Sequence, residues 1–251
     1  MNNNFSDKLR EAMAYRKRTN LPNLNLIIIS SAMFTLAYII LALFAIPGDR
    51  LPDYHFVSED GAITALSAVY LAMACSFSIA SLVVTIRAKE PHIWSWVIMI
   101  SGFGLLALDE VLQFHERFGR FIERYIDSGI FRNWSDIIVI AYGIVAILII
   151  VFIFPSIMRY KRLLELFIVA FIFYCITTLI DSTQEPKTTI SVIFEESAKL
   201  FCVLFLALGT FVAFIGSLWN LKPSDISQNE PSTLRLRLPD KMMNLIKKQQ
   251  N

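Results

Sequence analysis

Six long apolar runs constrain the fold of this chain more than any other feature of its sequence. A hydrocarbon core roughly 30 Å thick is crossed by about 20 apolar residues in helical form. In lipid, an open segment satisfies its own backbone hydrogen bonds only as a helix. The sequence therefore predicts an all-α fold, a bundle of six transmembrane helices. The runs cover residues 25–46, 62–86, 93–112, 136–154, 163–180 and 190–219.

The composition agrees with a membrane protein and excludes several other classes. Of the 251 residues, 55% are hydrophobic and 18% are charged, which excludes a disordered chain. The net charge of +2 provides no excess basic surface, so we expect no nucleic-acid partner. The three cysteines all lie inside the apolar runs, so we expect neither disulfides nor a thiolate zinc site. They are Cys75, Cys175 and Cys202.

The basic residues predict how the chain is oriented. If the N-terminus is cytoplasmic, 16 of the 23 Lys and Arg residues fall in cytoplasmic segments and 7 fall outside. The acidic residues show the opposite bias, with 7 of 21 inside. Because basic residues are retained on the cytoplasmic side of a membrane, we predict an N-in, C-in topology. A bacterial inner membrane is the expected location.

The chain divides into a membrane domain and two flanks. Residues 25–220 form the membrane domain, and residues 221–251 form a basic cytoplasmic tail, for which contact with anionic lipid and simple disorder are both open. The first apolar run is longer than a signal-peptide core, so we expect it to be retained. Residues 1–24 form a cytoplasmic segment in which apolar residues share one stripe of a helix, typical of a helix lying on a membrane surface. They are Phe5, Leu9, Ala12 and Met13.

Ionisable residues begin before the third apolar run ends. Successive positions of a helix turn by 100°, so Asp109, Gln113 and Glu116 share a stripe, and Asp109 and Glu116 lie about 20° apart around the axis. Glu110 points about 100° away from Asp109. One helix therefore cannot gather these groups and His115 around one atom, and a site here must recruit side chains from other helices.

Other helices bring further acids to the same outer level. A carboxylate at membrane depth costs roughly 2.5–3.5 kcal/mol at a helix centre, and neighbouring acids repel unless protons, basic side chains or a metal intervene. Carboxylates mixed with imidazole suit zinc, iron or manganese. We therefore predict a divalent metal ion at this end of the bundle. Its candidate ligands are Asp109, Glu110, His115, Asp181, Glu195 and Glu196.

Two simpler interpretations compete with this one. The third helix could project into water, with Glu116 paired to Arg120 at i+4 on a solvated face. Glu195 could merely pair with Lys199 at i+4. In the first case the opposite face of the helix would be its packed side. That face contains Val111, Phe114, Phe118, Phe121, Ile122 and Tyr125.

These residues resemble an uncharacterised family of bacterial polytopic membrane proteins. That family carries L-D-E-x4-H-E at the end of one span and an E-E pair that opens the last span. The likeness covers residues 93–219 and implies no activity. The family often has a further acid after the pair, where this chain has Lys199, which argues against a fully acidic metal cage. The matching residues here are Leu108-Asp109-Glu110, His115-Glu116 and Glu195-Glu196.

Three functions are compatible with this pattern. The first is an enzyme, a metal-dependent hydrolase, in which Glu110 and Glu116 act as catalytic carboxylates on a membrane lipid or other amphiphile. The second is a transporter or channel in which the acids hold a cation or proton. The third is a non-catalytic subunit that docks onto a membrane-complex partner or a second copy of the chain. A bound metal favours the first function, cation flux the second and a co-purifying partner the third.

Overall fold

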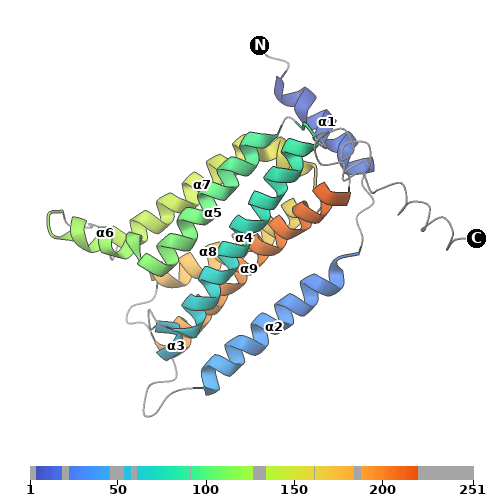
Figure 1. The fold of residues 1–251 in the computed structure, drawn as a ribbon. Coiled ribbons are helices and arrows are strands. Elements are labelled where there is room, and N and C mark those ends of the chain that lie inside the picture. Colours follow the sequence, from blue (N-terminus) through green and yellow to red (C-terminus); the bar gives the residue numbers. More distant parts are fainter. Residues whose placement is uncertain are drawn as a thin grey trace, which may run out of the picture.

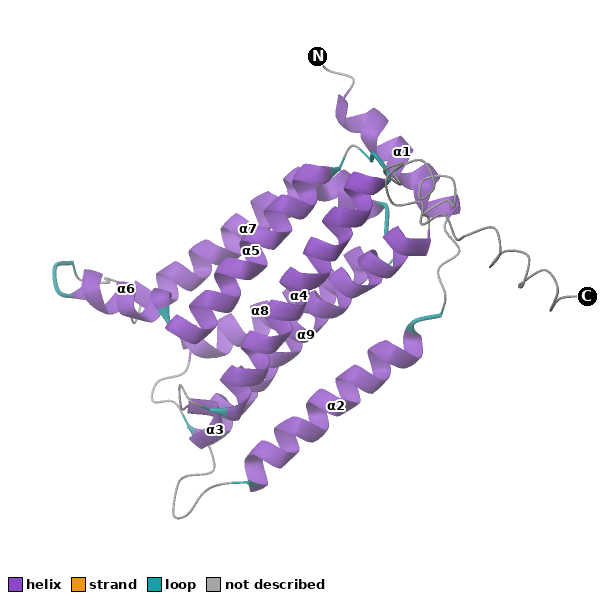
Figure 2. Cartoon of the chain, viewed as in Figure 1, coloured by secondary structure: helices purple, strands orange, loops and turns teal. Residues whose placement is uncertain are grey.

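The computed structural model describes residues 4–18, 23–45, 54–57, 61–90, 92–126, 134–160, 162–183 and 188–219. Every regular element in these ranges is a helix, as Figure 2 shows. The all-α prediction is therefore confirmed. The predicted basic tail, residues 221–251, lies outside the described residues.

Nine helices are described, and six of them are long and apolar enough to cross a membrane. These six are α2, α4, α5, α7, α8 and α9, and they correspond to the six predicted runs. The chain is therefore a polytopic membrane protein. The helices are α1 (Asn4–Arg18), α2 (Asn25–Phe44), α3 (Tyr54–Val57), α4 (Ala62–Arg87), α5 (Ile93–Leu112), α6 (Phe114–Glu123), α7 (Trp134–Met158), α8 (Leu163–Thr183) and α9 (Thr189–Trp219).

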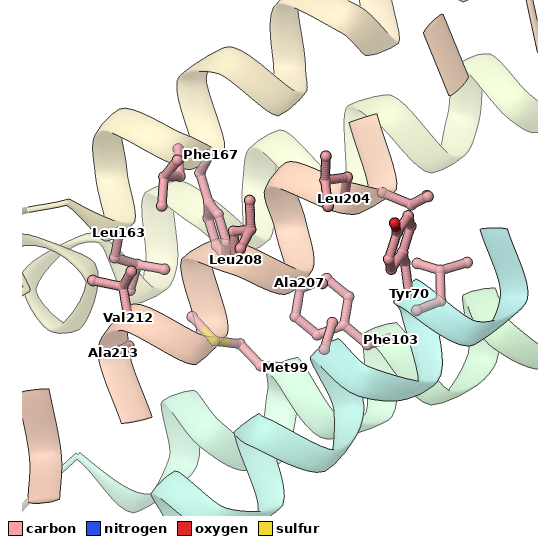
Figure 3. Packing of buried hydrophobic residues seen from close by; sticks show 14 of the residues in the cluster. Tyr70, Met99, Phe103, Leu163, Phe167, Leu204, Ala207, Leu208, Val212 and Ala213 are labelled. Carbon is pink, nitrogen blue, oxygen red and sulfur yellow. The ribbon is translucent and has the colours of Figure 1, made fainter. Parts of the chain in front are cut away.

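Helix α9 is the centre of the bundle and packs against both α4 and α8. Figure 3 shows how Leu204, Leu208 and Val212 of α9 lie among side chains from its neighbours. Small residues let the backbones approach closely. A Cβ atom on Gly209 would lie 2.7 Å from the ring of Phe167, so α8 could not pack this closely on any larger residue.

The two described ends of the chain lie at the same end of the bundle, as Figure 1 shows for α1 and the last turns of α9. An even number of spans requires this arrangement. We call this end the inner end and the opposite one the outer end, following the orientation that the basic residues predict. At the outer end α5 terminates and α9 begins.

The predicted N-terminal helix is present as α1. It packs on α7 at the inner end, where Ala12 is fully buried. Arg16 lies 3.9 Å from Glu165 at the start of α8. Phe5 and Met13 of the predicted stripe stay exposed, which suits a helix whose remaining apolar side chains meet lipid.

The structure corrects the prediction of a continuous third helix. Gln113 adopts a left-handed backbone conformation, with φ 53° and ψ 45°, so α5 ends at Leu112 and α6 begins as a separate helix. Figure 1 shows α6 leaving the bundle at an angle to α5. The stripe that was to join Asp109, Gln113 and Glu116 is therefore not formed.

The expected packed side of this segment is also wrong. Phe118 is 57% exposed and Tyr125 is 74% exposed, because α6 rests on the bundle through a different face. Gly119 is the buried residue of that face, and a Cβ atom there would lie 2.6 Å from the backbone nitrogen of Ser135 in α7. An amphipathic helix with exposed aromatic residues beside a membrane domain is typical of one that lies in the lipid–water interface.

Candidate functional site

Asp109 and His115 form a doubly hydrogen-bonded pair at the outer end of the bundle. Asp109, in the last turn of α5, is 8% exposed. Its Oδ1 accepts the backbone N–H of His115 at 2.9 Å, and its Oδ2 lies 2.8 Å from Nδ1 of the same residue. A carboxylate only accepts hydrogen bonds, so Nδ1 carries the proton in this pair. The second ring nitrogen, Nε2, is then unprotonated and can accept a proton.

The break at Gln113 produces this pair. On one continuous helix, residues six positions apart point about 120° away from each other, because six steps of 100° come to 600°, or 240° beyond one full turn. The left-handed residue turns the chain so that His115 meets Asp109. A non-glycine residue in this conformation costs of order 1–3 kcal/mol and persists only when its surroundings hold it.

A second cluster joins α5 to α9 beside the first. The ammonium of Lys199 lies 2.9 Å from Oε1 of Glu110 and 3.7 Å from Oε2 of Glu196. The side chain of Lys199 is 34% exposed, and that of Glu110 is buried. A lysine therefore stands between two of the predicted carboxylates. A basic side chain is one of the ways in which repulsion between neighbouring acids can be relieved. The partners of Lys199 are Glu110 and Glu196, whereas the simpler interpretation paired Lys199 with Glu195.

The remaining predicted residues lie around these two clusters. Glu195 is buried on α9, and its backbone carbonyl accepts a hydrogen bond from Thr177 of α8 at 3.1 Å. Asp181 is half-buried in the last turns of α8. Glu116 lies on α6, where it forms the expected pair with Arg120 at 3.2 Å. The structure thus joins Asp109 to His115 and Glu110 to Glu196 through a lysine, while Glu116 pairs within its own helix.

A groove of about 420 Å³ opens beside the Asp109–His115 pair, between α6 and α7. Sequence reasoning missed Arg117 and Tyr142 as parts of this site. Arg117 follows the motif directly and could have been included, whereas nothing in the sequence relates Tyr142 to His115. The groove combines apolar walls with a few polar groups, as ligand sites generally do. It is lined by Phe114, His115, Arg117, Phe118, Phe121, Ile138 and Tyr142.

The predicted metal ion would need several ligand side chains close together. Among the described residues, no group of three or more His, Cys, Asp or Glu side chains is placed to hold an ion. Lys199 occupies the position between Glu110 and Glu196, and Asp109 and His115 are bonded to each other. The arrangement as it stands does not fit a metal. The zinc, iron or manganese ion stays a prediction.

Comparison with protein families shows one match for this chain. A family model described as a domain of unknown function, DUF8692, matches residues 26–213. The chain belongs to this family. No curated protein and no solved structure matches it.

The DUF8692 match includes both outer clusters and the groove, and it leaves out α1. It agrees with the resemblance to an uncharacterised family that the sequence motifs suggested. The motif as a mark of the family and the bacterial source stay predictions.

The DUF8692 domain also has a polar cluster at its inner end. His92 shares a hydrogen bond of 3.1 Å with Ser156, which in turn lies 2.6 Å from Ser95. Arg159 is 5% exposed and pairs with Glu90 at 3.0 Å. Burial, followed by the nearby Arg159 charge, lowers the pKa of His92 to about 4. His92 is therefore neutral at physiological pH, and we call these residues the inner cluster.

Proposed function

We propose that this protein is a membrane hydrolase that acts on an amphiphilic substrate at the outer surface of the membrane. The observation that carries the proposal is the double hydrogen bond from His115 to Asp109 at the edge of a groove. A histidine held by a carboxylate through one ring nitrogen is the usual arrangement for a general base. The proposal makes His115 the base and Asp109 the residue that orients it.

The chemistry follows from the two nitrogens of His115. Asp109 engages Nδ1, so Nε2 is available to take a proton from water. The resulting hydroxide attacks an ester carbon or phosphorus, and the proton passes to the leaving alcohol. Asp109 stabilises the imidazolium that forms in between. Such proton transfer contributes about 10²–10⁴-fold to a rate.

The groove supports an amphiphilic substrate. Its walls include three phenylalanines of α6, and Tyr142 and His115 supply polar groups. The groove lies at the outer end, where α6 fits the interface between lipid and water. A substrate that moves sideways within a leaflet reaches this position without leaving the membrane.

The Lys199 cluster takes a supporting role in this proposal. Lys199 connects α9 to Glu110, which directly follows Asp109 on α5. The connection holds the end of α5 in place, and with it the carboxylate that orients His115. Glu110, which the sequence suggested as a catalytic carboxylate, thereby acts as a positioning residue, and Glu116 keeps its pair with Arg120.

The test is hydrolysis by the purified full-length protein of a panel of ester-containing lipids, with products measured by mass spectrometry. We expect His115→Gly to lower turnover by at least about 10²-fold and added imidazole to restore part of it. His55→Ala is the matched control, because His55 lies on the outer helix α3 and bonds the carbonyl of Ala45. Turnover by His115→Gly equal to wild type would overturn the proposal.

The predicted metal is tested separately. Elemental mass spectrometry on protein purified without chelator measures zinc, iron and manganese per chain. Stoichiometric metal that is lost in both Glu110→Ala and Glu196→Ala would place an ion at these carboxylates. It would replace the proposed base mechanism with a metal-dependent one.

A second function is favoured by one observation, the ion pair that Lys199 makes across two spanning helices. A cation- or proton-coupled transporter could exchange this pair for a transported ion. Proton or cation flux into liposomes, lost in Lys199→Gln and Glu110→Gln, is the result expected from that function. A bacterial inner-membrane location and assembly with a partner or a second copy remain further proposals.

A further inference from the structure

Arg117 is the cationic residue of the groove, and its charge is not engaged by the acids near it. Glu116, beside it, pairs with Arg120 at 3.2 Å. Glu123, further along α6, accepts the backbone N–H of Trp134 at 3.0 Å. Within the described part of the chain, no carboxylate is paired with Arg117. The guanidinium is therefore available to an anionic ligand.

The apolar walls of the groove restrict what that anion is attached to. Phe114, Phe118 and Phe121 follow one another along one side of α6 and are about half exposed. Ile138 and Tyr142, one turn apart on α7, form the opposite wall. A water-soluble anion would leave these walls exposed to water, whereas acyl chains would cover them.

We propose that the groove between α6 and α7 binds a glycerophospholipid with a net negative headgroup, taken from the outer leaflet, and that Arg117 selects the headgroup. This inference rests on the proposed function, whose substrate class it names. The guanidinium matches a phosphate in geometry as well as in charge, since it donates two parallel hydrogen bonds. The acyl chains then lie along the phenylalanines, and the ester bonds near the headgroup come to the level of His115.

Trp134 offers a local reporter of this binding. It begins α7, one turn before Ile138, and its ring N–H donates to the carbonyl of Ile126 at 2.8 Å. The other three tryptophans, Trp94, Trp96 and Trp219, lie at the inner end. A variant with phenylalanine at those three positions leaves Trp134 as the only tryptophan, at the outer end.

The experiment measures quenching of Trp134 by brominated lipids. The full-length reporter variant is placed in phosphatidylcholine bilayers that contain either brominated phosphatidylglycerol or brominated phosphatidylcholine, with bromine on the acyl carbons nearest the ester. We expect the anionic lipid to bind with about fivefold higher relative affinity, the effect of one arginine near a membrane surface. Equal quenching by the two lipids would overturn the inference.

Two variants test whether Arg117 causes the preference for the anionic lipid. Arg117→Gln should remove the preference for the anionic lipid, because the headgroup loses its cation. Arg124→Gln is the matched control, since Arg124 lies on the same amphipathic segment but outside the groove lining, and it should keep the preference. Loss of the preference in both variants, or in neither, would overturn the assignment to Arg117.

Failure of this inference is distinguishable from failure of the proposed function. Arg117-dependent lipid binding without any hydrolysis would leave the headgroup site standing and remove the hydrolase. Hydrolysis that depends on His115 but is indifferent to headgroup charge and to Arg117→Gln would keep the hydrolase and remove the headgroup site.

Discussion

The two ends of the bundle each carry a histidine, a basic side chain and an acid, yet they are built differently. At the inner end, Arg159 is buried, and the cavity beside it holds only about 10 Å³. At the outer end, Lys199 is a third exposed, and His115 lies on a groove of about 420 Å³. The inner cluster is closed, whereas the outer one lies beside an open groove.

The hydrogen-bond partners of the two histidines also differ between the inner and the outer end. His92 is bonded to a serine hydroxyl and lies near a guanidinium, and both burial and that charge disfavour its protonated form. His115 is bonded to the carboxylate of Asp109 through Nδ1, which leaves Nε2 as its second ring nitrogen. The first histidine is suited to holding helices together, and the second to accepting a proton. The role of a histidine near a membrane surface therefore depends on the groups that surround it.

The largest effect we expect is on catalysis, and it separates the two ends directly. Asp109→Asn removes the charge that stabilises the imidazolium and should lower hydrolysis by about 10²–10³-fold. His92→Gln at the inner end should leave turnover within about twofold of wild type, since His92 lies far from the groove. Product formation measured at equal protein concentration checks both. Comparable losses in the two variants would remove the distinction between the ends.

A smaller effect concerns the stability of the outer end. Lys199→Met leaves Glu110 and Glu196 without the ammonium between them and should lower the free energy of unfolding by about 2–4 kcal/mol. Unfolding in mixed micelles, followed by tryptophan fluorescence, measures this change.

A second substitution, Glu110→Gln, tests whether Lys199 stabilises the protein through Glu110. Because Glu110→Gln removes one of the two uncompensated charges, the double variant with Lys199→Met should regain part of the lost stability. Additive losses in the double variant would show that Lys199 does not act through Glu110.

The inner end should instead impose a pH dependence on stability. The pKa of His92 lies at about 4 in the folded protein, below its ordinary value of 6.5, so the unfolded chain binds the proton more tightly. The stability that neutral His92 contributes is present above about pH 6.5 and declines as the pH falls towards 4. Unfolding between these pH values, with His92→Gln as the control that lacks this part of the dependence, measures the effect.

The smallest effect concerns the two described non-glycine residues with left-handed backbones, one at each end. Lys89 has φ 55° and Gln113 has φ 53°. Because glycine adopts this conformation without strain, Lys89→Gly and Gln113→Gly should each raise the free energy of unfolding by about 0.5–1 kcal/mol. Alanine at either position should give no gain. A loss on Gln113→Gly would mean that the glutamine side chain itself stabilises the turn.

Some of the site could be predicted from the sequence, and the reasons are local. A carboxylate just inside an apolar run is costly wherever the helix packs, so Asp109, Glu110 and Glu196 stand out from composition alone. The partners of these carboxylates do not stand out in the sequence. That Glu110 meets Lys199 depends on the rotation of α5 against α9, and that His115 meets Asp109 depends on the backbone of a single residue. Glutamine has no preference that would reveal such a turn.

The sequence by itself determined the number and position of the spans, the helical N-terminal flank and the presence of acids at one end. Each of these depends on hydrophobic length or on charge near the membrane, which are properties of a segment taken alone. Tertiary structure decided which charges are paired, where the third helix breaks, and that residues of α6 and α7 share a groove. These depend on distances between helices, and residues distant along the chain set those distances together.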